Sequence, residues 1–556
     1  MTRRILLSSA LLLVACGDDS AGDTDGATDT DGFGTGSSMS QGPGSSPTGQ
    51  DSESGDDSTG QPQPTSGGDE STSGQPPLDP ANPAGGIRVT NVEVNQGVGI
   101  LVGSDGAPLT ANQRVAPIIG GRDALVRVDY SLDPSFTNRE IEARVFLGST
   151  AYVDQRSITG PSDWSSLEGT FVVRVDGADI QGDTALRVAL VEPGGAATVG
   201  TDVGSAFPAD EALDLEAWDD PMVLDVMLVP MTCDGYPSLD ITPEKLANFE
   251  AFLFNTYPVQ ELNLTVHDPV HSPSCNEFDA AEYDLPAVRD ADGAAPWVYY
   301  GGLLPGDGGG YSIAIQGGDQ MDYRRTFANH AWRDEGLTSD LFAHELGHNH
   351  GREHAFEDPS FPAETGAWCG PRASYGWGPR ASLMPTSGFS NDVSIGLPWF
   401  DPSVNLLAPT DKSCDGLPDG NRYNYNDFMS YTYPFWVSAY TYAAAAERIR
   451  LISSWRGKAY APPQGETARL VIGPEGDVHR VMLRGQRPVV DAEPAWAICG
   501  DQTVPVRVTH STLERPGRSG PPQSYAFVGY ELPLRDDLDV RECVLDIDGM
   551  RVPFVD

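Results

Sequence analysis

The chain has 556 residues, with 80 acidic residues against 35 basic ones and a formal net charge of -45 at pH 7. Contacts with phosphate groups need clusters of Lys and Arg, so this balance argues against nucleic acid as a partner. The length fits several domains, and the acidity bears on solubility and cation preference rather than on the fold.

The first residues have the pattern of an export signal. Two arginines precede an apolar run, Ile5 to Ala15, that is too short to be a stable transmembrane anchor. The run ends Leu-Val-Ala-Cys, which resembles a bacterial lipobox, where cleavage before the cysteine leaves it as the lipid-bearing N-terminus. We therefore expect residues 1–15 to be a lipoprotein signal peptide and Cys16 to anchor the exported protein to the outer membrane or cell surface. An ordinary secretory signal, which would release the protein, is the alternative.

Residues 16–85 consist of Gly, Ser, Thr, Asp, Pro and Gln with almost no large apolar side chain. Such a composition cannot bury enough surface to offset the entropy lost on ordering, so we expect a disordered acidic tether. A flexible coil of about 70 residues would hold the folded part on the order of 45 Å from its membrane anchor.

Residues 86–218 contain short stretches that alternate apolar and polar residues and are separated by turn residues. This pattern is typical of a β-sandwich, and we expect an immunoglobulin-like domain. The expected strands are residues 87–94, 123–130, 140–147, 170–176 and 185–191.

Residues 219–460 open with a strand and a helix. The run 222–229 is apolar and of strand length, and Thr242 with Pro243 forms a cap and first-turn proline for a helix. Further strands are expected at 262–266, 297–300 and 311–315, and a closing helix at 437–455. The pattern predicts an α+β domain with a mixed twisted sheet.

The segment 344–354 reads HELGHNHGREH. His344 and His348 are four residues apart, so on a helix both imidazoles lie on one face and can bind a single metal ion. Gly351 can adopt a positive φ angle, which would turn the chain back and bring in His354 as a third ligand. Three protein ligands leave one tetrahedral position open for water, which is the arrangement of catalytic rather than structural zinc.

Glu345 follows the first histidine and is not needed as a ligand. Its carboxylate is suited to take a proton from a zinc-bound water, whose pKa the metal lowers to about 7. His350 falls off the ligand face, and we expect it to be solvated or to lie behind the ligands. Thr338 or Ser339 is expected to cap the helix that carries these residues.

The motif HExxHxxGxxH resembles that of the metzincin metallopeptidases and is most similar to the gametolysin-like and mucin-cleaving members. A second motif, NDFMSY at 426–431, supports the resemblance. In that superfamily a methionine in a tight turn lies beneath the zinc, and Met429 matches it. The resemblance implies that Tyr431 is either a fifth zinc ligand or a hydrogen-bond donor to the oxyanion. It also implies that the strand at 311–315 lines the cleft and pairs with an extended substrate.

Residues 461–556 return to the pattern of short alternating strands. The expected strands are residues 469–472, 478–483, 505–510, 525–530 and 543–547. We therefore expect a multidomain chain in which an α+β metzincin-type catalytic domain is flanked by two all-β sandwich domains.

Six cysteines remain apart from Cys16, and an even number in an exported chain suggests disulfides. The separations between sequence neighbours are 42, 45 and 44 residues, which favours pairing each cysteine with its neighbour, although other connectivities remain open. The expected pairs are Cys233–Cys275, Cys369–Cys414 and Cys499–Cys543.

These features predict a cell-surface or secreted zinc-dependent endopeptidase that hydrolyses extracellular proteins or glycoproteins, with one zinc ion as its cofactor. Asp-rich loops such as Asp415 to Asp427 make calcium a second candidate cofactor. Two alternatives remain open: a catalytically inert adhesin or binding lipoprotein on a metalloprotease scaffold, and a zinc hydrolase of a non-protein amide.

The sequence suggests more than one role for the N-terminal sandwich. An inhibitory propiece is one interpretation, but residues 17–232 contain no cysteine whose thiolate could occupy an open zinc position. We favour a spacer or a substrate-binding role for this domain.

Overall fold

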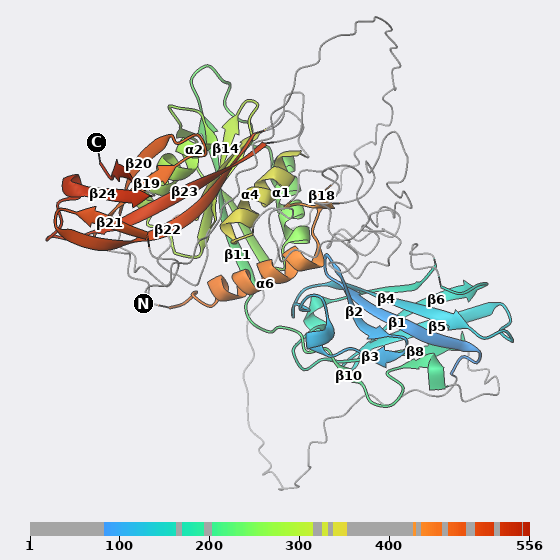
Figure 1. Ribbon diagram of the computed structural model, residues 1–556. Coiled ribbons are helices and arrows are strands. Elements are labelled where there is room, and N and C mark those ends of the chain that lie inside the picture. Colours follow the sequence, from blue (N-terminus) through green and yellow to red (C-terminus); the bar gives the residue numbers. More distant parts are fainter. Residues whose placement is uncertain are drawn as a thin grey trace, which may run out of the picture. The chain divides into compact units, whose positions relative to one another are not determined.

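The computed structural model describes residues 83–162, 169–193, 203–314, 325–331, 337–352, 426–429, 435–458, 465–484, 495–515, 523–547 and 549–555. The predicted signal peptide, Cys16 and nearly all of the predicted tether lie outside these ranges. Within them the chain consists mainly of β-strands in several sheets, with a smaller helical part (Figure 1). None of the described helices is long and apolar enough to cross a membrane.

The first described part is a two-sheet β-sandwich, as the alternating pattern predicts. One sheet has the order β3-β2-β1-β4-β7 and the other the order β10-β8-β5-β6, with β9 beside β8. All five expected strands are present, together with others that the pattern did not predict. The strands are β1 (Ile87–Asn95), β2 (Gly99–Ser104), β3 (Ala107–Pro108), β4 (Ala124–Leu132), β5 (Arg139–Leu147), β6 (Thr150–Ile158), β7 (Phe171–Val175), β8 (Ala185–Val191), β9 (Ala206–Phe207) and β10 (Leu213–Asp214).

The next part forms a mixed sheet in the order β12-β11-β14-β16-β15. Its strands are β11 (Val223–Thr232), β12 (Glu261–Val266), β14 (Val298–Pro305), β15 (Gly310–Ala314) and β16 (Thr326–Ala331), and a short β13 (Val270–His271) pairs with the end of β11. All pairings in this order are parallel except that of β15, which runs antiparallel to β16. The strands predicted here are confirmed, and β16 is an addition.

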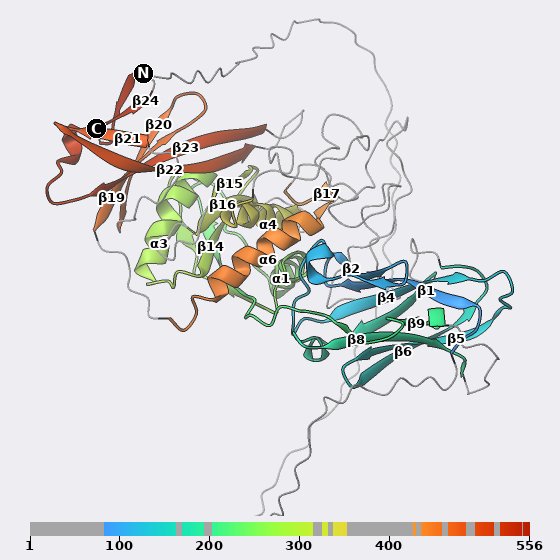
Figure 2. The same ribbon diagram turned by 60° about the horizontal axis from the view of Figure 1, so that its bottom comes forward.

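Helices cover both faces of this sheet (Figure 2). Adjacent residues of β11 face opposite sides, so Leu228 packs in the core on one face and Val229 in the core on the other. The first face carries α1 (Pro243–Thr256), α4 (Leu337–Asn349) and α6 (Ala439–Ser453). The second face carries α2 (Glu277–Asp279), the π-helical turn η5 (Ala280–Asp284) and α3 (Leu285–Ala291).

The helix boundaries partly agree with the prediction. Thr242 caps α1 as expected, since its hydroxyl oxygen accepts a hydrogen bond from the Lys245 amide at 3.2 Å. Helix α4 begins at Leu337, so Thr338 and Ser339 lie inside it and are not its caps. That part of the prediction was wrong.

The C-terminal strands branch from the long strand β22 into two groups, β23-β19-β20 and β21-β24-β25, which enclose a core of their own. This is the layout of a β-sandwich, as predicted from the alternating pattern. The strands are β19 (Glu466–Ile472), β20 (Val478–Arg484), β21 (Ala495–Cys499), β22 (Gln502–Arg515), β23 (Gln523–Leu534), β24 (Cys543–Ile547) and β25 (Met550–Pro553).

Strand β22 also joins the C-terminal strands to the central sheet. It pairs antiparallel with β15, from Tyr311 opposite Leu513 to Ala314 opposite His510. The C-terminal sandwich is therefore continuous with the central sheet, whereas the sequence suggested a separate flanking domain. The outer edge of Tyr311–Ala314, which we expected to pair with substrate, is covered by a strand of the same chain.

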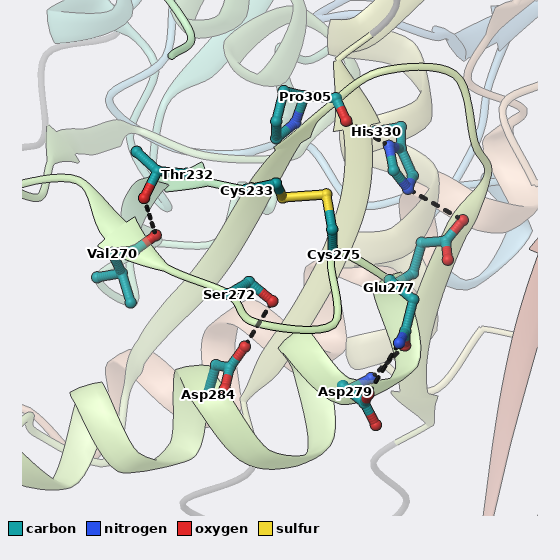
Figure 3. The surroundings of a disulfide bond; sticks show 11 residues. Thr232, Cys233, Val270, Ser272, Cys275, Glu277, Asp279, Asp284, Pro305 and His330 are labelled. Carbon is teal, nitrogen blue, oxygen red and sulfur yellow. Dashed lines mark hydrogen bonds and ion pairs between the residues drawn. A yellow bond between two sulfur atoms is a disulfide. The ribbon is translucent and has the colours of Figure 1, made fainter. Parts of the chain in front are cut away.

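Two of the three predicted disulfides fall within the described residues, and both are confirmed. They are Cys233–Cys275 and Cys499–Cys543. The first ties the end of β11 to the segment that precedes α2 (Figure 3). The third predicted pair, Cys369 with Cys414, lies outside the described residues.

Candidate metal centre

Helix α4 brings two of the predicted ligands together. His344 and His348 are 3% and 2% exposed, and their ring centroids lie 4.8 Å apart with the ring planes at 84°. The four-residue spacing therefore places both imidazoles on one buried face of the helix, as predicted.

The hydrogen bonds of the two rings fix their tautomers. Nδ1 of His344 lies 2.5 Å from the carbonyl oxygen of Phe428, and Nδ1 of His348 lies 2.7 Å from the carbonyl oxygen of Arg352. A carbonyl oxygen can only accept a hydrogen bond, so each Nδ1 carries the proton and donates it. In the neutral ring this leaves the lone pair on Nε2, the nitrogen that is then available to bind a metal ion.

The end of α4 supplies the partner of His348. Gly351 has a φ angle of +78°, and its amide donates to the carbonyl oxygen of His348 at 2.8 Å. The Arg352 amide donates to the carbonyl oxygen of Gly347 at 3.0 Å, which completes a Schellman motif. This turn positions the Arg352 carbonyl against the His348 ring. The predicted positive φ of Gly351 is confirmed.

The partner of His344 comes from the turn at 426–429. Asp427 is fully buried, and its two carboxylate oxygens accept hydrogen bonds from the amides of Met429 at 2.8 Å and Ser438 at 2.9 Å. Ser438 is the residue that caps α6. Asp427 therefore ties the turn to the start of α6. Because Phe428 lies between Asp427 and Met429 in the chain, the bond between these two residues also holds its carbonyl in place.

Met429 lies directly against α4 at Gly347. It is 1% exposed, and a Cβ atom built on Gly347 would approach its sulfur to 2.4 Å. A residue with any side chain at position 347 would therefore displace the thioether. Met429 therefore packs against the helix that carries His344 and His348.

Replacing Gly347 with alanine tests this contact, because the expected sign is unusual. Gly→Ala inside a helix normally stabilises a protein by up to about 1 kcal/mol. Here overpacking against Met429 should instead destabilise the fold by about 1–3 kcal/mol, measured by urea unfolding. Adding Met429→Ala should recover part of that loss, and a stabilising effect of Gly347→Ala alone would contradict the packing.

Glu345 lies against the backbone of β15. It is fully buried, and a Cβ atom built on Gly310 would come within 2.0 Å of its Oε1 atom. Only glycine leaves room there for the carboxylate. Glu345 therefore contacts the first residue of the strand whose continuation, Tyr311–Ala314, pairs with β22.

The segment that leads into Gly310 is held from the opposite face of the sheet (Figure 3). The Glu277 carboxylate accepts a hydrogen bond from the Gly309 amide at 2.8 Å and lies 3.5 Å from Nε2 of His330. Nδ1 of His330 donates to the Pro305 carbonyl oxygen at 3.1 Å, and a Cβ atom on Gly308 would overlap its ring. These contacts hold the backbone of Gly309 in place, next to the Gly310 backbone that contacts Glu345.

Asn349, at the end of α4, was not singled out from the sequence. It is buried, and its Nδ2 atom donates to the hydroxyl of Ser312 and lies 3.2 and 3.1 Å from the carbonyl oxygens of Ile313 and Thr326. Asn349 therefore locks the histidine helix to β15 and β16. The role of Asp427 was also missed, because the sequence placed it in the motif NDFMSY and in the Asp-rich loop without indicating that its carboxylate binds backbone amides.

The expectation for His350 was partly wrong, since the residue is not solvated. It is 5% exposed and packs edge-on against the rings of Tyr257 and Tyr299, at centroid distances of 5.2 and 4.9 Å. Burial lowers the pKa of His350 well below its usual range, and the charges of Arg448 and Arg325 act in the same direction. His350 is a neutral core residue.

Several predicted residues lie outside the described part of the chain: His354, Tyr431 and most of the Asp-rich loop that begins at Asp415. Within the described part, no three His, Cys, Asp or Glu side chains converge as metal ligands. The oxygens of Asp427, the last residue of that loop, accept the two backbone hydrogen bonds given above.

The comparisons with known proteins give no family for this chain. No protein-family model matches it, and a search of curated proteins finds no significant relative.

Proposed function

We propose that the protein is a zinc-dependent endopeptidase. The observation that carries the proposal is the pair of Nδ1–carbonyl hydrogen bonds, which set both buried histidines of α4 in the tautomer that ligates zinc. The mixed sheet beside α4 supports the proposal, because the resemblance to metzincins implies a mixed sheet next to the helix that carries the histidines. The donor set fits zinc because imidazole nitrogens are among its preferred ligands.

Each residue then has a distinct role. His344, His348 and His354 would hold the zinc ion. Bound zinc would act as a Lewis acid on the scissile carbonyl and lower the pKa of water to about 7. Glu345 accepts a proton from the attacking water and passes it to the leaving amine, and Tyr431 donates a hydrogen bond to the oxyanion.

Because β22 covers the outer edge of β15, a substrate would have fewer places at which to bind along this strand. Its pairing with β22 spans Tyr311–Ala314, so a peptide cannot add as a further strand along these residues. We propose that the substrate chain lies beside Gly310 and the residues before it, where Glu345 is in contact with the backbone. The proposed substrates are extracellular proteins or glycoproteins, reached from a lipid anchor at Cys16.

Digestion of casein or a peptide library by the purified full-length protein tests this function. Cleavage should stop when zinc is removed with a chelator and return when zinc is added back. If the protein binds zinc but cleaves no peptide bond while hydrolysing another amide, it is a hydrolase of a different class. If it binds zinc and hydrolyses neither, the inert adhesin becomes the better description.

A further inference from the structure

Trp436 connects the turn beside His344 to the N-terminal sandwich. It lies in β18 (Phe435–Trp436), which pairs with β17 (Asn426–Asp427). Its carbonyl oxygen accepts a hydrogen bond from the Phe428 amide at 2.7 Å, and its indole nitrogen donates to the Gly97 carbonyl oxygen at 2.8 Å. Gly97 belongs to the turn between β1 and β2 of the sandwich. Phe428, whose carbonyl contacts His344, is therefore hydrogen-bonded to Trp436, and Trp436 is in turn hydrogen-bonded to the sandwich.

The sandwich is fixed against this part of the chain by a buried arginine. Arg122 is 1% exposed and donates to the carbonyl oxygens of Phe254, Tyr257 and Val259 at 2.7, 2.6 and 2.9 Å. Phe254 is in the last turn of α1, and the other two residues follow the helix. Moving the sandwich away would break these three hydrogen bonds and expose to water a hydrophobic core that residues of the sandwich share with α1 and α6. The contact is therefore part of the folded core and not a loose docking of two domains.

The Gly97 turn itself is held on both sides. The side-chain nitrogen of Gln96 donates to the carbonyl oxygens of Ile119 and Arg122, both at 2.8 Å. Gly97 has a φ angle of +124°, and a Cβ atom there would approach the Asn255 carbonyl oxygen to 2.6 Å. Only glycine lets the Gly97 carbonyl reach Trp436 at this close approach.

We infer that the N-terminal sandwich is a positioning domain for the histidine centre. It fixes Trp436, Trp436 fixes the Phe428 amide, and the Phe428 carbonyl sets the tautomer of His344. Asp427 holds the same turn from the α6 side. The sandwich is on this account neither a spacer nor a removable propiece, and Trp436 is a positioning residue. The inference rests on the proposed zinc function only for its affinity readout.

The test compares full-length variants. Trp436→Phe keeps the aromatic ring and removes the indole donor, and Gly97→Ala forces a Cβ atom into the contact. Gly148→Ala is the matched control, because Gly148 also has a positive φ angle, +56°, but has nothing within 4 Å of its Cβ position. The Kd for zinc, measured by competition with a chelator, should rise about 10- to 100-fold in the first two variants and stay at the wild-type value in the control.

A second readout does not need zinc. Nitrogen NMR of the metal-free protein, with labelled histidine, should show His344 losing its single Nδ1–H tautomer in Trp436→Phe. His348 should keep its Nδ1–H tautomer, because its hydrogen-bond partner is the Arg352 carbonyl, which follows α4 and is not part of the turn that Trp436 contacts. If Trp436→Phe changes neither the zinc affinity nor the His344 tautomer, the inference is wrong. If the wild-type protein binds no zinc, the proposed function fails, and the tautomer alone decides the inference.

Discussion

Glu345→Gln is expected to lower the rate of peptide hydrolysis by about 10²- to 10⁴-fold while zinc content and folding stay at the wild-type level. Glutamine has nearly the same shape, so it fits the buried space against Gly310. Its amide cannot accept the proton of the attacking water, so the loss falls on turnover. The measurement is kcat on a peptide found in the library digest, with zinc determined on the same sample.

Asp340→Asn is the matched control for that variant. Asp340 is also a buried acid of α4, one turn before His344, and burial raises its pKa to about 7. Its Oδ1 atom accepts a hydrogen bond from the Leu341 amide at 2.9 Å, which asparagine can retain. We expect near wild-type turnover from this variant. If Glu345→Gln also kept a near wild-type rate, Glu345 would not be the base.

Arg469→Met is expected to destabilise the protein by about 3–5 kcal/mol. Arg469 lies 2.8 Å from Glu282, and both side chains are fully buried. The Glu282 carboxylate also accepts a hydrogen bond from the Tyr311 hydroxyl at 2.7 Å, and that hydroxyl lies 2.6 Å from Ser511 Oγ. Removing the arginine would leave a buried carboxylate without its counter-charge at the junction of the central and C-terminal sheets.

Urea unfolding of the full-length protein measures this loss. Arg535→Met is the control, because the Arg535–Asp537 pair is exposed and such pairs contribute about 0–1 kcal/mol. Adding Glu282→Gln to Arg469→Met should recover part of the stability, since it removes the uncompensated charge. An Arg469→Met variant as stable as the control would mean that the C-terminal strands do not depend on this pair.

The sequence predicts well those features that depend on local spacing. The apolar alternation of strands such as β5 and β8, the helix start at Thr242, the shared face of His344 and His348 and the positive φ of Gly351 all follow from positions a few residues apart. The pairing of cysteines with their nearest neighbours also agrees with the structure at both described disulfides.

The features that the sequence did not predict depend on contacts between distant segments. The pairing of β15 with β22 joins residues about 200 positions apart, and neither strand's own pattern specifies its neighbour. His350 looks solvated beside a ligand, but two tyrosines from separate elements bury it. The sequence suggests that Asp427 belongs to an acidic loop, although its carboxylate accepts hydrogen bonds from the backbone amides of Met429 in the turn and of Ser438 at the start of α6.

The most direct test of the account is the zinc content of the purified full-length protein and of its His348→Ala variant, with folding checked by circular dichroism. We expect one zinc per chain in the wild-type protein and none in the variant, because the variant lacks one of the paired imidazoles. A correctly folded wild-type protein that takes up no zinc, or a His348→Ala variant that keeps it, would contradict the assignment of this helix as a metal centre.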